Sequence, residues 1–226
     1  MDFTEIESRV ARLNTLVSEG RIARNEWFGI DEQGRATACL LAALSPEAGD
    51  AENADFCPAA VMPLWLAHIT PWIDDACSET AWPRVIRRYA ACAARWSALD
   101  DAAWRRVEIA TRRAAVEEAM RHTSNKTVHG ATVLGACRGV LVWLDADMPE
   151  SSQAAVKMAA QAAAWAAVAD RQAAAAAQAA AWAASGRAAE ARAAAQAAVA
   201  QARVSVESAD RIIDVVLSAL EKECGL

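Results

Sequence analysis

The sequence predicts an all-α protein in which a globular helical part is followed by a long alanine-rich helical hairpin. Apolar residues recur at three- and four-residue steps through most of residues 1–150, and this is the period of one helix face. Between Gln153 and Arg203, 30 of 51 residues are alanine, the residue with the highest helix propensity. We therefore expect a helical globular domain over residues 1–150 and a coiled-coil-like antiparallel hairpin over residues 151–226.

The first elements are expected in quick succession. One apolar stripe predicts a helix that ends at Gly20, where glycine favours termination. This stripe consists of Phe3, Ile6, Val10, Leu13 and Val17. Residues 27–30 then suggest a short extended piece with a possible partner near Arg35, and a compact apolar helix is expected over residues 36–44.

Prolines dominate the next region. Five of the six lie between residues 46 and 83, so we expect an exposed loop and short helical pieces there. These pieces are expected over residues 61–69 and 72–77. Three longer helices are expected after them, over residues 82–96, from Asp100 or Asp101 to Arg121, and over residues 128–144.

The alanine-rich part contains two tryptophans, Trp165 and Trp182, in identical seven-residue strings that are 17 residues apart. A heptad places both indole rings on one seam. The pair Ser185–Gly186 is the expected hairpin turn, after which Val199 to Leu220 form an uninterrupted a/d series. The alternative is one continuous helix through Gly186.

Composition restricts the class of protein. The net charge is −6, which would repel nucleic acids and anionic membranes. The sequence has neither a signal-peptide pattern at its start nor a strongly apolar stretch long enough to span a bilayer. Its six cysteines contain no C-x-x-C pair, which favours reduced thiols. We therefore expect a soluble cytoplasmic protein without a membrane partner.

Two polar groups could carry chemistry. The first is His68 with Asp74 and Asp75, and the second is His122 with His129, in a stretch rich in Ser, Thr and Asn. Neither spacing forces its members to converge as metal or acid–base sites require, and helix capping explains the same residues. Common nucleotide, hydrolase and metalloprotease motifs do not occur. We expect no enzyme, cofactor or metal; the alternative is a small hydrolase or transferase at one of these groups.

Arginines provide the only basic surface that the sequence suggests. A stripe on helices could bind phosphate or an acidic partner, through Arg84, Arg88, Arg105 and Arg112. However, Glu108 stands four residues before Arg112, and such i,i+4 pairs are ordinary on solvated helix faces. We expect no nucleic-acid partner, with this stripe as the weaker alternative.

A large indole ring among alanines projects beyond its neighbours. It must pack on the globular part, on the opposite rod or on a partner chain, and tryptophan is a frequent interface residue. The expected function is a protein–protein interaction module that acts as a homo-oligomer or docks a partner along its helical surface. The candidate contact residues are Trp165, Trp182, Val199, Val206, Ile213, Val216 and Leu220.

Two segments and the alanine- and tryptophan-rich tail carry a resemblance. The segments are Glu26–Gly34, with the sequence EWFGIDEQG, and Cys57–Asp75, which contains CPAAVMPLW and TPWIDD. Together they resemble uncharacterised helical proteins of bacterial and prophage genomes. The resemblance implies no activity and no functional residues. A prophage setting would favour a small protein that binds or blocks a host factor.

Overall fold

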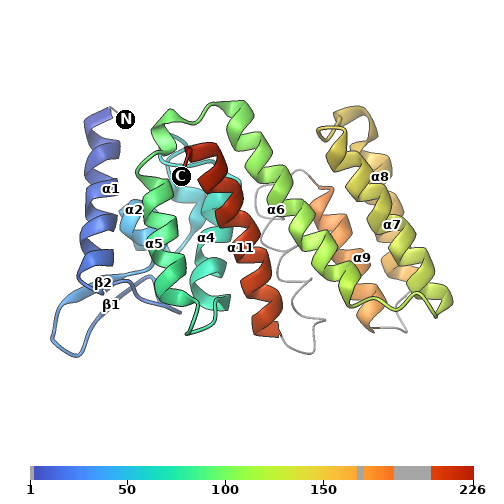
Figure 1. Ribbon diagram of the computed structural model, residues 1–226, viewed down its shortest axis with the longest axis horizontal. Helices are drawn as coiled ribbons and strands as arrows, with labels where there is room; N and C mark the ends of the chain where they lie inside the picture. The colour runs from blue at the N-terminus through green and yellow to red at the C-terminus, as the bar shows by residue number, and fades with distance from the viewer. Residues whose placement is uncertain (1–2, 167–170, 186–204) are drawn as a thin grey trace. The chain divides into compact units, whose positions relative to one another are not determined.

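The computed structural model describes residues 3–166, 171–185 and 205–226, and these are mostly helical (Figure 1). The all-α prediction is confirmed. The elements are α1 (Phe3–Ser18), β1 (Phe28–Ile30), β2 (Ala36–Ala38), α2 (Leu40–Leu44), α3 (Pro46–Asp50), the 3-10 turn η1 (Ala54–Phe56), α4 (Leu64–Ala76), α5 (Trp82–Ala93), the 3-10 turn η2 (Trp96–Ala98), α6 (Asp101–Arg121), α7 (Val128–Asp145), α8 (Glu150–Ala166), α9 (Arg171–Ala183) and α11 (Ser205–Cys224).

The chain divides into two compact units. Unit 1 consists of Met1–Val107 together with Leu217–Leu226, and unit 2 consists of Glu108–Val216. This division does not fall at residue 150, where the sequence suggested it. The C-terminal part of α11 belongs with the N-terminal elements, and α7 packs with the alanine-rich helices α8 and α9.

Unit 1 begins with α1 and a small hairpin. The strands β1 and β2 pair antiparallel, with Phe28 opposite Ala38, as the extended piece near Trp27 and its partner near Arg35 predicted. The predicted helix over residues 36–44 is therefore too long. Residues Ala36–Ala38 hydrogen-bond to β1, and the helix starts only at Leu40, where the Cys39 sulfur accepts the Ala42 amide.

The core of unit 1 forms around α4. The two predicted helical pieces are one helix that contains Pro71. The proline removes one backbone hydrogen bond, and the Thr70 hydroxyl beside it donates to the Leu66 carbonyl at 2.8 Å. Thr70 also bonds the Tyr89 hydroxyl of α5 at 2.8 Å, in an interior with no solvent access to Tyr89. The Thr70 hydroxyl beside the proline is thus satisfied within the core.

Unit 2 packs α7, α8 and α9 against one another (Figure 1). The alanine-rich helix expected before the turn at Ser185–Gly186 is therefore two helices of 17 and 13 residues, with only residues 167–170 between them. Alanine gives every helix face the same small side chain, so the sequence has no apolar stripe that could mark where one helix ends. The expected turn at Ser185–Gly186 and the continuous helix through Gly186 both reach beyond the described residues.

One buried arginine joins α6 to α9. The Arg112 side chain has no solvent exposure and donates to Glu108 Oε1 at 2.7 and 3.0 Å. It also donates to the Ala183 carbonyl at 3.0 Å. Since Ala183 is the last residue of α9, the guanidinium binds a carbonyl that the helix leaves without an internal partner. A directional polar contact therefore fixes a helix that has almost no large side chains.

Replacing Arg112 with Met should destabilise unit 2 by about 3 kcal/mol, because it leaves the Glu108 carboxylate and the Ala183 carbonyl without this partner. Arg113→Met is the matched control on the next position. Arg113 pairs with Glu117 and Asp145 at the surface, where ion pairs contribute only about 0–1 kcal/mol. Urea unfolding followed by circular dichroism measures both changes. Equal losses in the two variants would contradict the anchoring role of Arg112.

Candidate functional site

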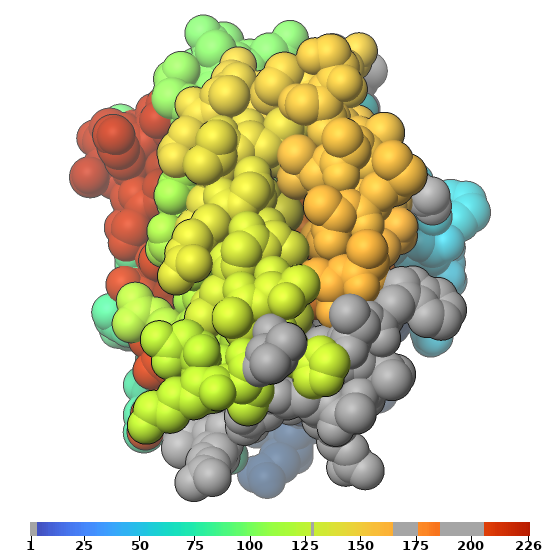
Figure 2. Space-filling view, turned by 90° about the vertical axis from the view of Figure 1, so that its right-hand side faces the viewer, coloured from blue at the N-terminus to red at the C-terminus, as the bar shows by residue number. Residues whose placement is uncertain are grey.

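The most distinctive surface of unit 2 is a groove between α7 and α8, on the side of unit 2 that Figure 2 shows. It has a volume of about 590 Å³ and is lined almost entirely by small residues. From α7 come Thr132, Gly135, Ala136 and Gly139, and from α8 come Ala155, Val156, Ala159, Ala162 and Ala163. Helices with such residues let another backbone approach closely.

Two glycines of this groove are not required by the fold of the chain. A Cβ atom added at Gly135 or Gly139 would meet no other atom within 4 Å. At Gly130, on the same helix, an added Cβ would collide with the Ser124 carbonyl oxygen. A glycine inside a helix destabilises it by roughly 0.5–1 kcal/mol relative to alanine. Gly135 and Gly139 therefore weaken α7 and leave open space at its surface.

Two large apolar side chains accompany the groove. Val142 of α7 is 67% exposed and Met158 of α8 is 64% exposed. We call the six exposed residues that line the groove, together with Val142 and Met158, the α7–α8 face: Thr132, Gly135, Gly139, Val142, Ala155, Met158, Ala159 and Ala162. None of the eight carries a charge. An exposed apolar surface with both a hollow and protruding side chains is typical of an interaction site.

The candidate contact residues whose side chains the structure describes do not belong to the α7–α8 face. Ile213, Val216 and Leu220 have no solvent exposure, so this part of the a/d seam is core of the chain itself and offers no surface to a partner. Val206 is 47% exposed and Trp182 is half-buried. Val199 and the Trp165 side chain lie outside the described residues.

The first polar group predicted from the sequence does not converge. His68 Nε2 bonds Asp55 Oδ1 at 2.9 Å. Asp74 is buried, and its Oδ2 accepts the Leu40 amide at 3.0 Å, while Asp75 Oδ1 accepts the Asn25 amide at 2.9 Å. These two carboxylates hold backbone amides of the preceding segment, and the contacts of His68 are with a different residue.

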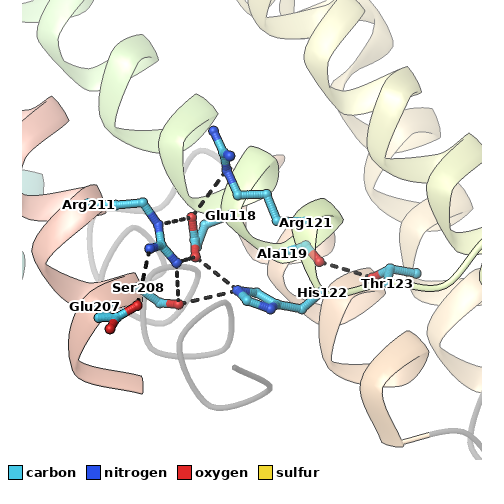
Figure 3. A network of polar contacts seen from close by, with 8 residues as sticks. All are labelled: Glu118, Ala119, Arg121, His122, Thr123, Glu207, Ser208 and Arg211. Atoms are coloured by element: carbon cyan, nitrogen blue, oxygen red, sulfur yellow. Dashed lines mark hydrogen bonds and ion pairs between the residues drawn. The ribbon is translucent and has the colours of Figure 1, made fainter. Parts of the chain in front are cut away.

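The second polar group gives only His122 a defined role. His122 Nε2 lies 3.0 Å from Glu118 Oε1 and 3.3 Å from the Ser208 hydroxyl (Figure 3). Arg211 donates twice to Glu118, at 2.5 and 3.0 Å. These contacts join α6 to α11 within unit 2, and His129 belongs to α7. The cluster is an ion-pair network with one acid at its centre.

The environment of Glu118 changes its acidity. The carboxylate side chain is only 3% exposed. Burial raises the pKa of Glu118, but hydrogen bonds from Arg211, Ser208 and His122 outweigh it and lower the pKa to about 2. Hydrogen bonding to the charged form is the dominant cause. Glu118 is therefore an ionised structural acid, held by the basic groups that surround it.

The basic stripe is not a free surface. Arg112 is buried, and Arg88 donates to Glu221 at 2.6 and 2.8 Å and to the Ser218 hydroxyl at 2.9 Å. Arg84 and Arg105 also have interactions within the chain.

Among the described residues, no group of three or more His, Cys, Asp or Glu side chains could hold a metal ion. No described helix is both long and apolar enough to cross a membrane.

Comparison of the chain with protein-family models, with curated proteins and with solved structures gave no match. The α7–α8 face therefore rests on its own geometry. The helix expected over residues 128–144 was confirmed, but its glycines were not recognised as part of a surface. Their spacing was the available signal, because Gly135, Gly139 and Val142 follow at four and three residues and so share one helix face.

Glu118→Gln should destabilise the protein by about 2–3 kcal/mol at pH 7, because a pKa lowered from 4.5 to about 2 favours the ionised folded form. This contribution is complete well above pH 4.5 and is lost as the pH falls toward 2. At pH 3, roughly 40% of it should remain. Urea unfolding of both proteins at pH 7 and pH 3 measures the change. Glu207→Gln, at an exposed partner of Arg211, is the control. An unchanged difference between pH 7 and pH 3 would rule out this linkage.

Asp74 should show the opposite pH dependence. Burial raises the pKa of Asp74 well above 3.8, so the folded state binds this proton more tightly than the unfolded state. Stability from this group is present below pH 3.8 and is lost as the pH rises through the folded pKa. As the pH rises above 3.8, Asp74→Asn should therefore gain stability relative to the natural protein, as measured by urea midpoints. Asp75→Asn is the neighbouring control, and a relative loss in Asp74→Asn would disprove the prediction.

Proposed function

We propose that this protein is a protein–protein interaction module that self-associates through the α7–α8 face. The observation that carries the proposal is the pair Gly135 and Gly139. They weaken their own helix, and none of the described residues places an atom within 4 Å of a Cβ added at either glycine. Small residues in a helix interior that the fold itself does not require allow the backbone of another chain to pack closely.

A second copy is the occupant that this face fits by shape. An isologous interface requires one surface to carry both halves of the contact. The hollow at Gly135 and Gly139 and the protruding Met158 lie on the same face. Met158 directly precedes Ala159, which lines the groove together with both glycines. A two-fold axis parallel to the helices lays α8 of one copy over α7 of the other, with Met158 of each against the glycines of its neighbour.

The chemistry of the face also fits association by apolar contact. Its eight residues are uncharged, and the exposed Arg138 stands between Gly135 and Val142 on the same side of α7. Burying Val142 and Met158 in a shared interface would contribute about 1.5–3 kcal/mol for each fully buried side chain. Small residues around them would let the backbones come within the short end of the usual 8–10 Å interhelical range.

The test is a pair of matched substitutions on α8. Ala159→Leu fills the groove, whereas Ala154→Leu adds the same side chain at an exposed position that does not line it. Sedimentation equilibrium should show a dimer whose dissociation constant rises at least about tenfold, or roughly 1.4 kcal/mol, in Ala159→Leu only. A natural protein that stays monomeric at its highest soluble concentration would refute self-association.

A second pair of variants separates association from folding. Gly135→Ala and Gly139→Ala add methyl groups that meet no atom of the described residues beyond the backbone of α7 itself. Each should raise the free energy of unfolding by roughly 0.5–1 kcal/mol and at the same time weaken the dimer. Loss of folding stability in these variants would show that the glycines serve the fold of α7 itself.

A further inference from the structure

Unit 1 contains a separate cavity of about 510 Å³, well within the 300–1,000 Å³ range of small-molecule sites. Four segments enclose it: α1, residues 59–63 before α4, the turn η2 and the start of α6. Its deep walls are fixed, since Val61, Met62 and Trp96 are at most 5% exposed. The cavity is therefore a property of packed elements, and it is independent of the α7–α8 face.

Two indole rings form one side of this cavity. The ring centroids of Trp96 and Trp104 are 5.8 Å apart, and their planes meet at 65°. Behind them, Tyr89 packs on Trp96 at 5.3 Å and 84°, which holds the inner ring in place. Trp104 is half-buried and also lines the cavity. The face of a tryptophan ring attracts positive charge more strongly than any other side-chain ring.

One carboxylate supplies the charge of the cavity. Asp101 lines it and lies three residues before Trp104, so both side chains occupy the same face of α6. The carboxylate is exposed, and the described part of the chain gives it no hydrogen bond or ion pair. Of the described residues that line the cavity, none is basic. A cation is therefore the complementary ligand charge.

The partial positive charges at the helix N-termini beside the cavity do not reverse its preference for a cation. The start of a helix carries about half a positive charge. At α6 this is offset by Asp100, whose Oδ1 accepts the Ala103 amide at 2.7 Å. At α4, which begins after the lining residue Pro63, about half a charge opposes the full charge of Asp101. The net field in the cavity remains negative.

We infer that this cavity binds a methylated or alkylated ammonium group, with the cation against Trp104 and its charge facing Asp101. The aromatic rings supply contact with the alkyl groups. The carboxylate supplies the opposite charge, and none of the described residues that line the cavity is basic. Such a group occurs both in free quaternary ammonium compounds and in trimethylated lysine side chains. The size of the cavity accepts either.

Calorimetric titration of the full chain with choline tests the inference. Its control ligand is 3,3-dimethyl-1-butanol, which has the same shape without the charge. Choline should bind at least about tenfold more tightly than the alcohol, as expected for a cation–aromatic contact with a carboxylate nearby. Equal affinities, or no binding of choline, would overturn the inference. A trimethyl-lysine peptide, compared with its unmethylated form, shows whether a free compound or a protein side chain is preferred.

The site is assigned by a pair of single-charge variants. Asp101→Asn should weaken choline binding at least about fivefold, and Glu79→Gln, an exposed acid of unit 1 outside the cavity, should leave it unchanged. Trp104→Phe, which keeps an aromatic ring, should weaken it less than Trp104→Ala. Circular dichroism verifies that each variant is folded. Equal choline affinities of Asp101→Asn and the natural protein would place the bound ligand elsewhere and refute the assignment.

Discussion

The small size of alanine is the constraint on which unit 2 depends. The buried residues of α9 are all alanines, and each removes little apolar surface from water. Large interdigitating side chains, which usually fix the rotation and height of a helix, are absent from its described buried positions. Directional polar contacts take over this role. Arg112 holds the last carbonyl of α9, and Arg211 with Glu118 joins α6 to α11. The arrangement of these helices thus rests on few contacts, each with a defined geometry.

How well the fold could be predicted from the sequence also depends on the size of the side chains. Where large apolar residues alternate with charged ones, as in α1 and α6, helix bounds came within about three residues of the structure. Two errors arose where local and tertiary effects compete. Pro71 suggested a helix end, but Thr70 and the surrounding core keep α4 continuous. Ala36 to Ala38 have helical propensity, yet they pair with β1. In the alanine-rich part every face is alike, so periodicity could indicate helix but not its ends.

The apolar face of α11 and the glycines of α7 show what a sequence pattern cannot predict about a surface. The a/d series of α11 correctly marked an apolar face, and Ile213, Val216 and Leu220 are buried. A row of apolar residues along one helix face predicts that this face is buried. It does not tell whether the same chain or another chain buries it. The opposite holds for Gly135 and Gly139. A Cβ added at either glycine would meet no atom of the described residues beyond the backbone of α7, and only coordinates reveal this. The sequence cannot distinguish these glycines from Gly130 on the same helix, where an added Cβ would collide with the Ser124 carbonyl oxygen.

The division of the chain also orders its assembly during synthesis. Unit 1 is closed by residues that follow the whole of unit 2: Leu217, Leu220 and Cys224 are buried in it, and Glu221 pairs with Arg88. A ribosome therefore releases most of unit 1 long before the segment that completes it. Domains usually fold in the order in which they are made, and here the part made first has to wait for the part made last. Until then its exposed apolar surface is a natural substrate for chaperones.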